Sequence, residues 1–386
     1  LLLLWAFAGP LGIDSLRPET ASAAEITERA LAAVGEAESF RGTLVVVVSS
    51  IFGLPGDASA VQQTSETRHA YVETARGDFR LVGSTGDGLN ADVCYEQTTG
   101  IQRLLVTDDE GRPVEAHETT GLAAGPPDPG PHYRWNLSAT VRALRASSDA
   151  AVEEVAHEGR PAWTLSSDIQ PNLIDDGGPD HLRVTVEQET GFPVSVVYSR
   201  LGQTLFEMRL EDLEVDPELP ADAFALEFPA GVSVDRIDEG FQRVDITRRG
   251  AEAAAVVGYM PVLPSELPGG FVLTELNVAE IGRPSGKEGM NPAAPGVVSA
   301  LYRRGFDQVV VSTRLVGDDP SLWSDPLASG EGYIDRPEPV MLASGAFAGC
   351  VAEVLINVLT TPHLWAMNDT LVLTISGDLT RDELLA

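Results

Sequence analysis

Positive charge is scarce in this chain, and lysine is almost absent. The 386 residues include 26 Lys or Arg against 58 Asp or Glu, which gives a formal net charge of −32 and a sequence pI of about 4.4. Lys287 is the only lysine. A chain this acidic is repelled by phosphate backbones and by anionic lipid surfaces. The composition therefore argues against nucleic acid or an anionic membrane surface as a partner.

Motifs for catalysis and for metal binding are also missing. No serine stands in the G-x-S-x-G pattern of a nucleophile elbow. The loop Gly282–Lys287 has three residues between its glycines where a phosphate-binding loop has four, and Glu288 follows where that loop has Ser or Thr. The six histidines show no metal-ligand spacing, and Asp108–Glu110 does not fit a calcium loop. We therefore predict no enzymatic activity, no cofactor and no metal site.

Cysteine occurs only twice, as Cys94 and Cys350. In an oxidising compartment two such residues can pair as a disulfide. They fall in different predicted domains, however. A disulfide and two separate buried thiols both remain open.

Long apolar runs are confined to the start of the chain. Residues 1–13 are apolar but too short as given to span a bilayer. Ala21–Ala23 fits a signal-peptidase site, whereas the polar residues Asp14–Glu19 before it favour the end of a membrane anchor and a linker. We favour the anchor, and both interpretations place the rest of the chain outside the cytoplasm. We also expect the chain to be a fragment at both ends.

The first folded element is predicted to be an amphipathic helix over residues 23–37. Ser22 and Glu25 form a capping box at its start. The strand expected next, Phe40–Ser50, is apolar on both faces from Leu44 to Val48, which predicts that both faces are covered. The apolar face of the helix recurs at helical spacing, at Ile26, Ala30, Leu31 and Val34.

Three antiparallel strands are predicted between His181 and Gly231. Apolar and polar residues alternate along each, as they do in half-buried strands. Glu189–Gly191 and Leu201–Gly202 form the turns, and Gly191 can adopt the positive φ that a hairpin turn requires. One face of this three-stranded unit is therefore apolar and must be covered.

The same segment resembles part of a known superfamily. The turn Thr190–Pro193, then Leu219–Pro220 followed by Phe224, and finally Pro229–Gly231 have the order and spacing of the C-terminal half of LolA-like proteins. That superfamily includes lipoprotein carriers, actinobacterial lipid-binding relatives and RseB-like regulators of envelope stress. None of these matching residues is catalytic.

A second resemblance covers the end of the chain. Pro264–Phe271, Leu301–Gly305 and Leu371–Leu385 are similar to the small C-terminal domain of RseB-like proteins. Together the two resemblances imply an α+β fold with a curved antiparallel β-sheet, a half-barrel covered by helices, and a smaller C-terminal α/β domain. The expected limits are residues 1–22 for the signal or anchor remnant and linker, 23–231 for the half-barrel, 232–254 for a linker and 255–386 for the second domain.

The resemblance implies two functions for the apolar face. In the first, helices at 23–37 and 138–146 roof a groove that holds an acyl chain of a lipid or lipoprotein. In the second, the chain is an RseB-like regulator that binds an anti-sigma factor or another membrane-anchored signalling protein. A solid core under the helices is the alternative to a groove. The residues expected to line the groove are Val184, Val186, Val194, Val196, Phe206 and Met208.

Overall fold

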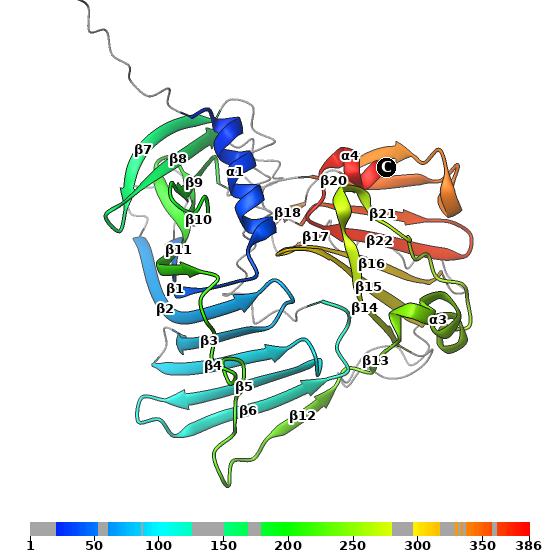
Figure 1. Cartoon of the computed structure of the whole chain (residues 1–386), viewed down its shortest axis with the longest axis horizontal. Coiled ribbons are helices and arrows are strands. Elements are labelled where there is room, and N and C mark those ends of the chain that lie inside the picture. The colour runs from blue at the N-terminus through cyan, green and yellow to red at the C-terminus, as the bar shows by residue number, and fades with distance from the viewer. Residues whose placement is uncertain are drawn as a thin grey trace, which may run out of the picture.

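Two open β-sheets make up most of the chain in its computed structural model (Figure 1). The apolar segment 1–13, the helix expected from Ser138 and the loop at Gly282 lie outside the residues that the structure describes. The described residues are 21–52, 61–85, 88–125, 150–168, 179–279, 296–316, 329–330, 333–334, 337–356 and 361–386.

The first sheet is curved and contains twelve strands, in the order β12-β6-β5-β4-β3-β2-β1-β11-β10-β9-β8-β7. Neighbouring strands are antiparallel except β12, which runs parallel to β6. The turn after β7 folds back toward β11, where Glu158 accepts a hydrogen bond of 2.8 Å from the Asp212 amide. The strands are β1 (Ser39–Phe52), β2 (Val61–Thr74), β3 (Phe79–Ser84), β4 (Leu89–Glu96), β5 (Ile101–Asp108), β6 (Pro113–Thr120), β7 (Ala151–His157), β8 (Arg160–Asp168), β9 (His181–Glu187), β10 (Pro193–Arg200), β11 (Gln203–Val215) and β12 (Asp235–Asp238).

One long helix, α1 (Ala23–Glu36), packs on this sheet beside β8, β9 and β10 (Figure 1). The predicted capping box is present: Ser22 Oγ accepts from the Glu25 amide at 3.3 Å, and Glu25 Oε2 accepts from the Ser22 amide at 2.8 Å. The helix buries three of the four residues that its spacing predicts, Ile26, Ala30 and Val34, and also Thr27, whereas Leu31 is half-buried. The predicted curved antiparallel sheet with a covering helix is thus confirmed.

The second sheet is smaller, with eight strands in the order β13-β14-β15-β16-β22-β21-β20-β19. Short helices α3 (Arg249–Val257) and α4 (Arg381–Leu385) accompany it, and α4 begins at the predicted capping box of Thr380 and Glu383. Within the described residues, 3-10 turns occur at η1 (Ile246–Arg248), η2 (Pro268–Gly270) and η4 (Gly345–Phe347), and β17 (Ser329–Gly330) pairs with β18 (Tyr333–Ile334). The strands are β13 (Phe241–Arg243), β14 (Val272–Ala279), β15 (Val297–Arg304), β16 (Asp307–Leu315), β19 (Glu338–Met341), β20 (Val351–Leu355), β21 (His363–Met367) and β22 (Leu371–Gly377).

The segment expected as a linker, 232–254, contributes strands to both sheets. Strand β12 extends the edge of the first sheet, and β13 pairs with β14 of the second. Helix α3 begins within this segment and contacts β14. The division into domains 23–231 and 255–386 stays a prediction, and the connection between them carries regular structure.

The turn between β9 and β10 requires glycine at position 191. Gly191 has a φ of 73°, as predicted. The turn also lies against α1, because a Cβ at Gly191 would be 3.1 Å from Cγ of Arg29 and 3.4 Å from Cβ of Ala33. The hairpin and the helix therefore constrain each other at this position.

Replacing Gly191 by alanine is expected to destabilise the fold more than replacing Gly202 by alanine. Both glycines have positive φ, at 73° and 78°, so each variant bears about 1–2 kcal/mol of backbone strain. Gly202 has open space around it. At Gly191 the added methyl group also crowds α1, which costs about 1 kcal/mol more. Urea unfolding of both variants measures the difference, and equal losses would contradict the contact with α1.

Candidate functional site

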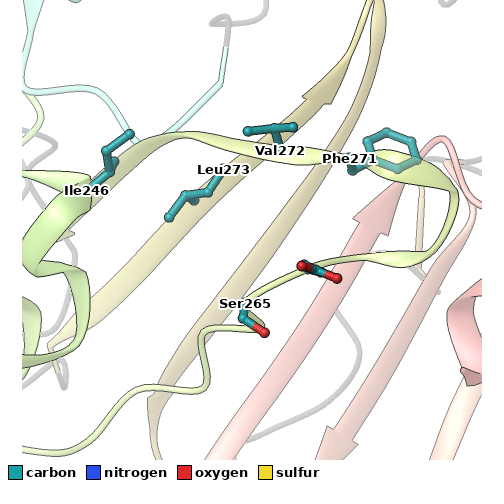
Figure 2. Close-up of a pocket in the computed structure, with 6 residues that line it drawn as sticks. Ile246, Ser265, Phe271, Val272 and Leu273 are labelled. Atoms are coloured by element: carbon teal, nitrogen blue, oxygen red, sulfur yellow. The ribbon is translucent and has the colours of Figure 1, made fainter.

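A hollow of about 310 Å³ lies at the start of β14 in the second sheet (Figure 2). It is open to solvent, since Val272 and Ile246 are 64% and 38% exposed. Among the described residues that line it, the polar side chains are one hydroxyl, Ser265, and one carboxylate, Glu266. A hydroxyl nucleophile needs an adjacent general base and groups that stabilise the transition state. The described lining holds neither a histidine nor a cysteine for such a role.

The six residues expected to line a groove lie together on one face of the first sheet, which we call the inner face. Val184, Val196 and Met208 are adjacent in one row across three strands. They are 0%, 2% and 5% exposed. Neighbouring strands extend the row, because each residue is the Cα partner of the next from β7 to β1: Val152, Leu165, Val184, Val196, Met208 and Val46.

A second apolar row runs beside the first. Its members are also cross-strand partners, in the order Leu182, Tyr198, Phe206 and Val48. Phe206 is half-buried, whereas Val186 and Val194 are fully buried nearby. The alternation in the sequence therefore predicts the inner face correctly. It did not single out the partners from outside the three-stranded unit, Val152, Leu165 and Val46, because the pairing of distant strands is not visible in a local pattern.

Helix α1 covers these rows with a narrow apolar face. Ile26 and Ala30 pack in one cluster with Val184 and Val196. Val34 packs in a second cluster with Val194, Met208 and Leu210. Ile26 and Val34 are the only fully buried side chains of α1 larger than threonine. In this structure the inner face under α1 is thus filled by side chains of the helix.

The two ends of α1 are attached differently. At its C-terminal end, Oδ1 of Asp216 accepts hydrogen bonds from the amides of Glu38 at 2.7 Å and Ser39 at 2.9 Å. Further toward the N-terminus, Arg29 donates to the carbonyl oxygens of Gln188 and Glu189. Its guanidinium also lies 5.4 Å from the ring centre of Trp163. The residues that follow α1 are therefore tied to the Asp216 carboxylate just after β11, whereas the N-terminal half of the helix is attached by one arginine and by apolar contact.

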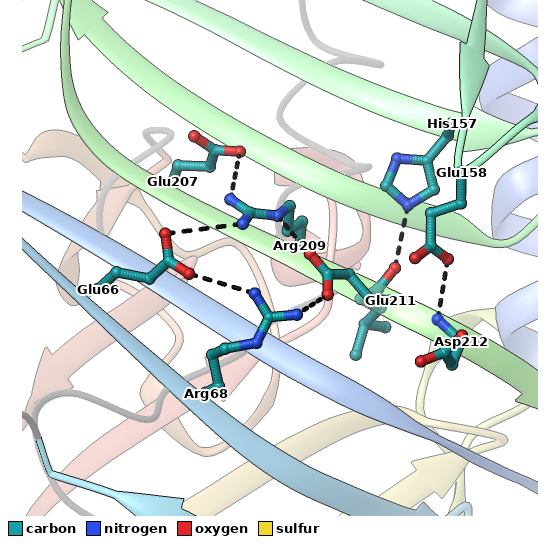
Figure 3. A network of polar contacts seen from close by, with 9 residues as sticks. Glu66, Arg68, His157, Glu158, Glu207, Arg209, Glu211 and Asp212 are labelled. Carbon is teal, nitrogen blue, oxygen red and sulfur yellow. Dashed lines mark hydrogen bonds and ion pairs between the residues drawn. The ribbon is translucent and has the colours of Figure 1, made fainter.

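The opposite, outer face of β1 is covered by ion pairs (Figure 3). Val45 lies between Arg68 on β2 and Arg209 on β11, and it is 0% exposed. The prediction that both faces of this strand are covered is thus correct, with side-chain charges as the outer layer. The pairs are Arg209 with Glu207 at 3.2 Å, with Glu211 at 2.9 Å and with Glu66 at 3.8 Å, and Arg68 with Glu66 at 3.2 Å and also with Glu211.

A buried histidine lies on the inner face beyond the end of the apolar rows. His69 on β2 is the partner of Leu44 on β1 and of Gly83 on β3, and it is 0% exposed. A Cβ at Gly83 would be 2.7 Å from Nδ1 of His69, so the glycine leaves room for the ring. Burial lowers the pKa of His69 to about 4, because it disfavours the charged imidazolium. The ring is therefore neutral in the folded protein at pH 7.

Acidification is expected to destabilise the protein through His69. Its folded pKa of about 4 lies below the value of about 6.5 for an unfolded chain. Its stabilising contribution is therefore fully present above pH 6.5 and is lost as the pH falls through 4. The loss amounts to about 3 kcal/mol. His69→Leu should remove this part of the pH dependence, and the difference in unfolding free energy between the two proteins from pH 7 to pH 4 measures it. A difference in unfolding free energy that does not change between pH 7 and pH 4 would contradict the lowered pKa of His69.

Polar side chains connect the two sheets, and Glu275 on β14 is at their centre. Glu275 is 2% exposed and lies 3.0 Å from Nη2 of Arg243. It accepts hydrogen bonds from Asn277 Nδ2 at 2.8 Å and from Gln97 Nε2 of the first sheet at 2.5 Å. We call Gln97, Arg243, Glu275, Asn277 and Arg303 the interface cluster.

The interface cluster also binds backbone carbonyls of the first sheet. Arg243 donates to the Gln97 oxygen at 2.8 Å, Asn277 to the Leu122 oxygen at 2.9 Å, and Arg303 to the Ala75 oxygen at 3.3 Å. Local sequence patterns did not predict this cluster. The available signal was Glu275 and Asn277 inside the otherwise apolar strand VLTELNVA, since a charge in a buried strand needs a partner.

The remaining candidates do not form reactive sites in the described part of the chain. Cys94 and Cys350 are both free thiols, and burial raises the pKa of Cys94 to about 11. Among the described residues, no three His, Cys, Asp or Glu side chains are placed to hold a metal ion. No helix within the described ranges has the length and apolar character to cross a membrane.

No family model matches the chain, and a search of curated proteins finds no relative. Solved structures are similar to it at low identity. The Pseudomonas aeruginosa MucA/MucB complex matches at 16% identity and a TM-score of 0.29, covering 94% of this chain and 96% of that chain. LprF from Mycobacterium bovis matches at 14% and 0.33, over 53% of this chain and 97% of that one.

A LolA superfamily protein from Nitrosomonas europaea matches at 12% identity and a TM-score of 0.21, over 54% of this chain and 99% of that chain. Values this low assign no function. The similar solved structures also include MucB, at 15% identity and a TM-score of 0.30.

Proposed function

We propose that this chain is a non-enzymatic extracytoplasmic protein that binds the acyl chain of a lipid or lipoprotein on the inner face of its first sheet. One observation carries the proposal. An unbroken apolar row crosses six strands, and its cover is a helix with only two large buried apolar side chains, Ile26 and Val34. An acyl chain would bind along this row, where Ile26 and Val34 of α1 now pack.

The magnitudes favour exchange of the helix for a ligand. Burial of Ile26 and Val34 contributes about 1.5–3 kcal/mol each, so their release costs about 3–6 kcal/mol. An acyl chain of about sixteen carbons gains on the order of 10 kcal/mol gross, at about 0.8 kcal/mol for each buried methylene. The ligand therefore gains more than the helix loses, provided that α1 stays attached at its C-terminal end.

Titration with a fluorescent fatty acid tests the proposal. The wild-type protein should bind the probe saturably, and an unlabelled fatty acid should displace it. Ile26→Ala should bind the probe more tightly, because about 2 kcal/mol or more of helix packing no longer has to be lost. Ile246→Ala in the open hollow of the second sheet is the control and should bind like the wild type. Absence of saturable binding by the folded wild-type protein would refute the proposal.

A second candidate is an RseB-like regulator that binds an anti-sigma factor or another membrane-anchored signalling protein. The interface cluster favours this candidate. Binding an acyl chain requires only the first sheet, whereas a second sheet attached to it through polar contacts provides a surface for a protein partner. Binding of the extracytoplasmic segment of such a partner, measured by calorimetry with lipid-free protein, tests this candidate. No binding heat at micromolar concentrations would exclude it for that partner.

A further inference from the structure

The turn between β15 and β16 inserts an aromatic ring of the second sheet into the core of the first. The centre of the Phe306 ring lies 5.3 Å from that of Phe40 on β1, with 53° between the ring planes. Phe40 is in turn 5.4 Å from Phe192 and 5.5 Å from Tyr71. Phe306 is thus the one ring of this group that belongs to the second sheet.

Phe306 packs against the same apolar cluster as the residues of the inner face. That cluster includes Val194 and Met208, which we expect to contact a ligand, and Val34 of α1. A residue of the second sheet therefore borders the place where the acyl chain would bind. The ring is half-buried, so part of it remains at the edge of the contact.

The turn also meets the end of α1 at close range. Gly305 has a φ of 57°, and a Cβ there would lie 2.4 Å from the carbonyl oxygen of Gly35. Gly35 belongs to the last turn of α1. Only glycine at position 305 permits this approach, so a displacement of α1 acts directly on the turn.

The turn is held in shape by its own sheet. Arg304 donates to Oδ2 of Asp307 at 2.7 Å and to the Gly269 oxygen at 2.9 Å. Its guanidinium also lies 4.4 Å from the ring centre of Phe271. These contacts hold the turn in one conformation. Withdrawal of the Phe306 ring therefore requires the whole turn to move.

We propose that the β15–β16 turn is an inhibitory plug: Phe306 occupies the end of the inner face next to α1 and withdraws when an acyl chain enters. The inference rests on the proposed lipid binding and extends it. Ligand binding then removes the Phe306 contact between the two sheets. The position of the second sheet would therefore depend on whether the inner face is occupied. A ligand that shifts α1 and one that displaces the ring have the same effect, because both act on the same turn.

The test uses the same fluorescent fatty acid with the full chain. Phe306→Ala should bind it about tenfold more tightly than the wild type, since apparent affinity scales with the fraction of binding-competent molecules. Gly305→Ala keeps the ring but drives the turn away from Gly35, and it should show a similar gain. Gly202→Ala is its control, because it places alanine at positive φ in a hairpin with open surroundings.

Hydrogen exchange gives an independent readout of the plug. In the wild type, addition of the fatty acid should speed the exchange of the amides of residues 304–307. Tighter binding by Phe306→Ala and Gly305→Ala together with faster exchange supports the plug. Equal affinity in all variants and unchanged exchange overturns the plug but leaves lipid binding intact. No binding by the wild type or by either variant overturns both.

Discussion

Glu275→Met is expected to lower the free energy of unfolding by at least about 2 kcal/mol and to let the two sheets melt separately. The carboxylate is 2% exposed and is the common acceptor for Arg243, Asn277 and Gln97. Removing the carboxylate leaves the buried Asn277 amide and the half-buried Gln97 amide without their acceptor, at about 1–3 kcal/mol for each unsatisfied group, whereas Arg243 is 42% exposed and remains hydrated. Differential scanning calorimetry should show a lower midpoint and two transitions.

Two matched variants control this result. Glu275→Gln retains one acceptor oxygen and should lose less stability than Glu275→Met. Glu214→Met removes the partner of Arg41 in a 2.7 Å pair whose side chains are 54% and 44% exposed, and such a surface pair contributes about 0–1 kcal/mol. If Glu275→Met were no more harmful than Glu214→Met, the interface cluster would not hold the sheets together.

Val196→Asp is expected to abolish binding of the fluorescent fatty acid, with a loss of affinity of at least about 100-fold. Val196 is at the middle of the apolar row and is 2% exposed. A carboxylate there faces either α1 or the acyl chain without a partner, and burying a polar group without one costs several kcal/mol. Circular dichroism must accompany the titration, because the same charge also opposes the packing of α1.

Milder variants separate loss of binding from loss of folding. Phe206→Asp places the charge at a half-buried position and should be better tolerated by the fold while still opposing the ligand. Val196→Thr and Val197→Thr form an isosteric pair on opposite faces of β10, since Val197 is paired with Glu207 of the outer face. The threonine at 196 should weaken binding, and the one at 197 should leave it unchanged. Equal effects of the pair would contradict a ligand on the inner face.

Local patterns predicted the parts of the fold that are stabilised locally. The capping box at Ser22 marks the start of α1, and alternation from His181 to Leu210 identifies β9, β10 and β11 with the correct inner residues. Strong period-2 alternation is unambiguous wherever one face is buried and the other is exposed. The core under α1 follows from these two signals together.

Elements whose surroundings are remote in sequence were not predicted. Strand β6 is largely polar and buries only Ala116. Its sequence therefore lacks the alternation of apolar and polar residues that predicts a strand. Strands β12 and β13 are four and three residues long and form only because an edge of each sheet is available to them. Gln97 and Glu275 are 178 residues apart, and nothing in either local sequence indicates that they meet. Phe306 and Phe40 are likewise far apart in the sequence, and no local pattern indicates that their rings meet.

Native mass spectrometry of the purified, folded protein tests the acyl-chain account most directly. The account predicts a lipid-sized mass increment on the wild-type chain, or its appearance after incubation with a fatty acid, and its absence from Val196→Asp and Phe206→Asp. A folded wild-type protein that carries no lipid, binds no probe and takes up no fatty acid would contradict it. The inner face would then be a solid core, and the partner-binding regulator would be the better account.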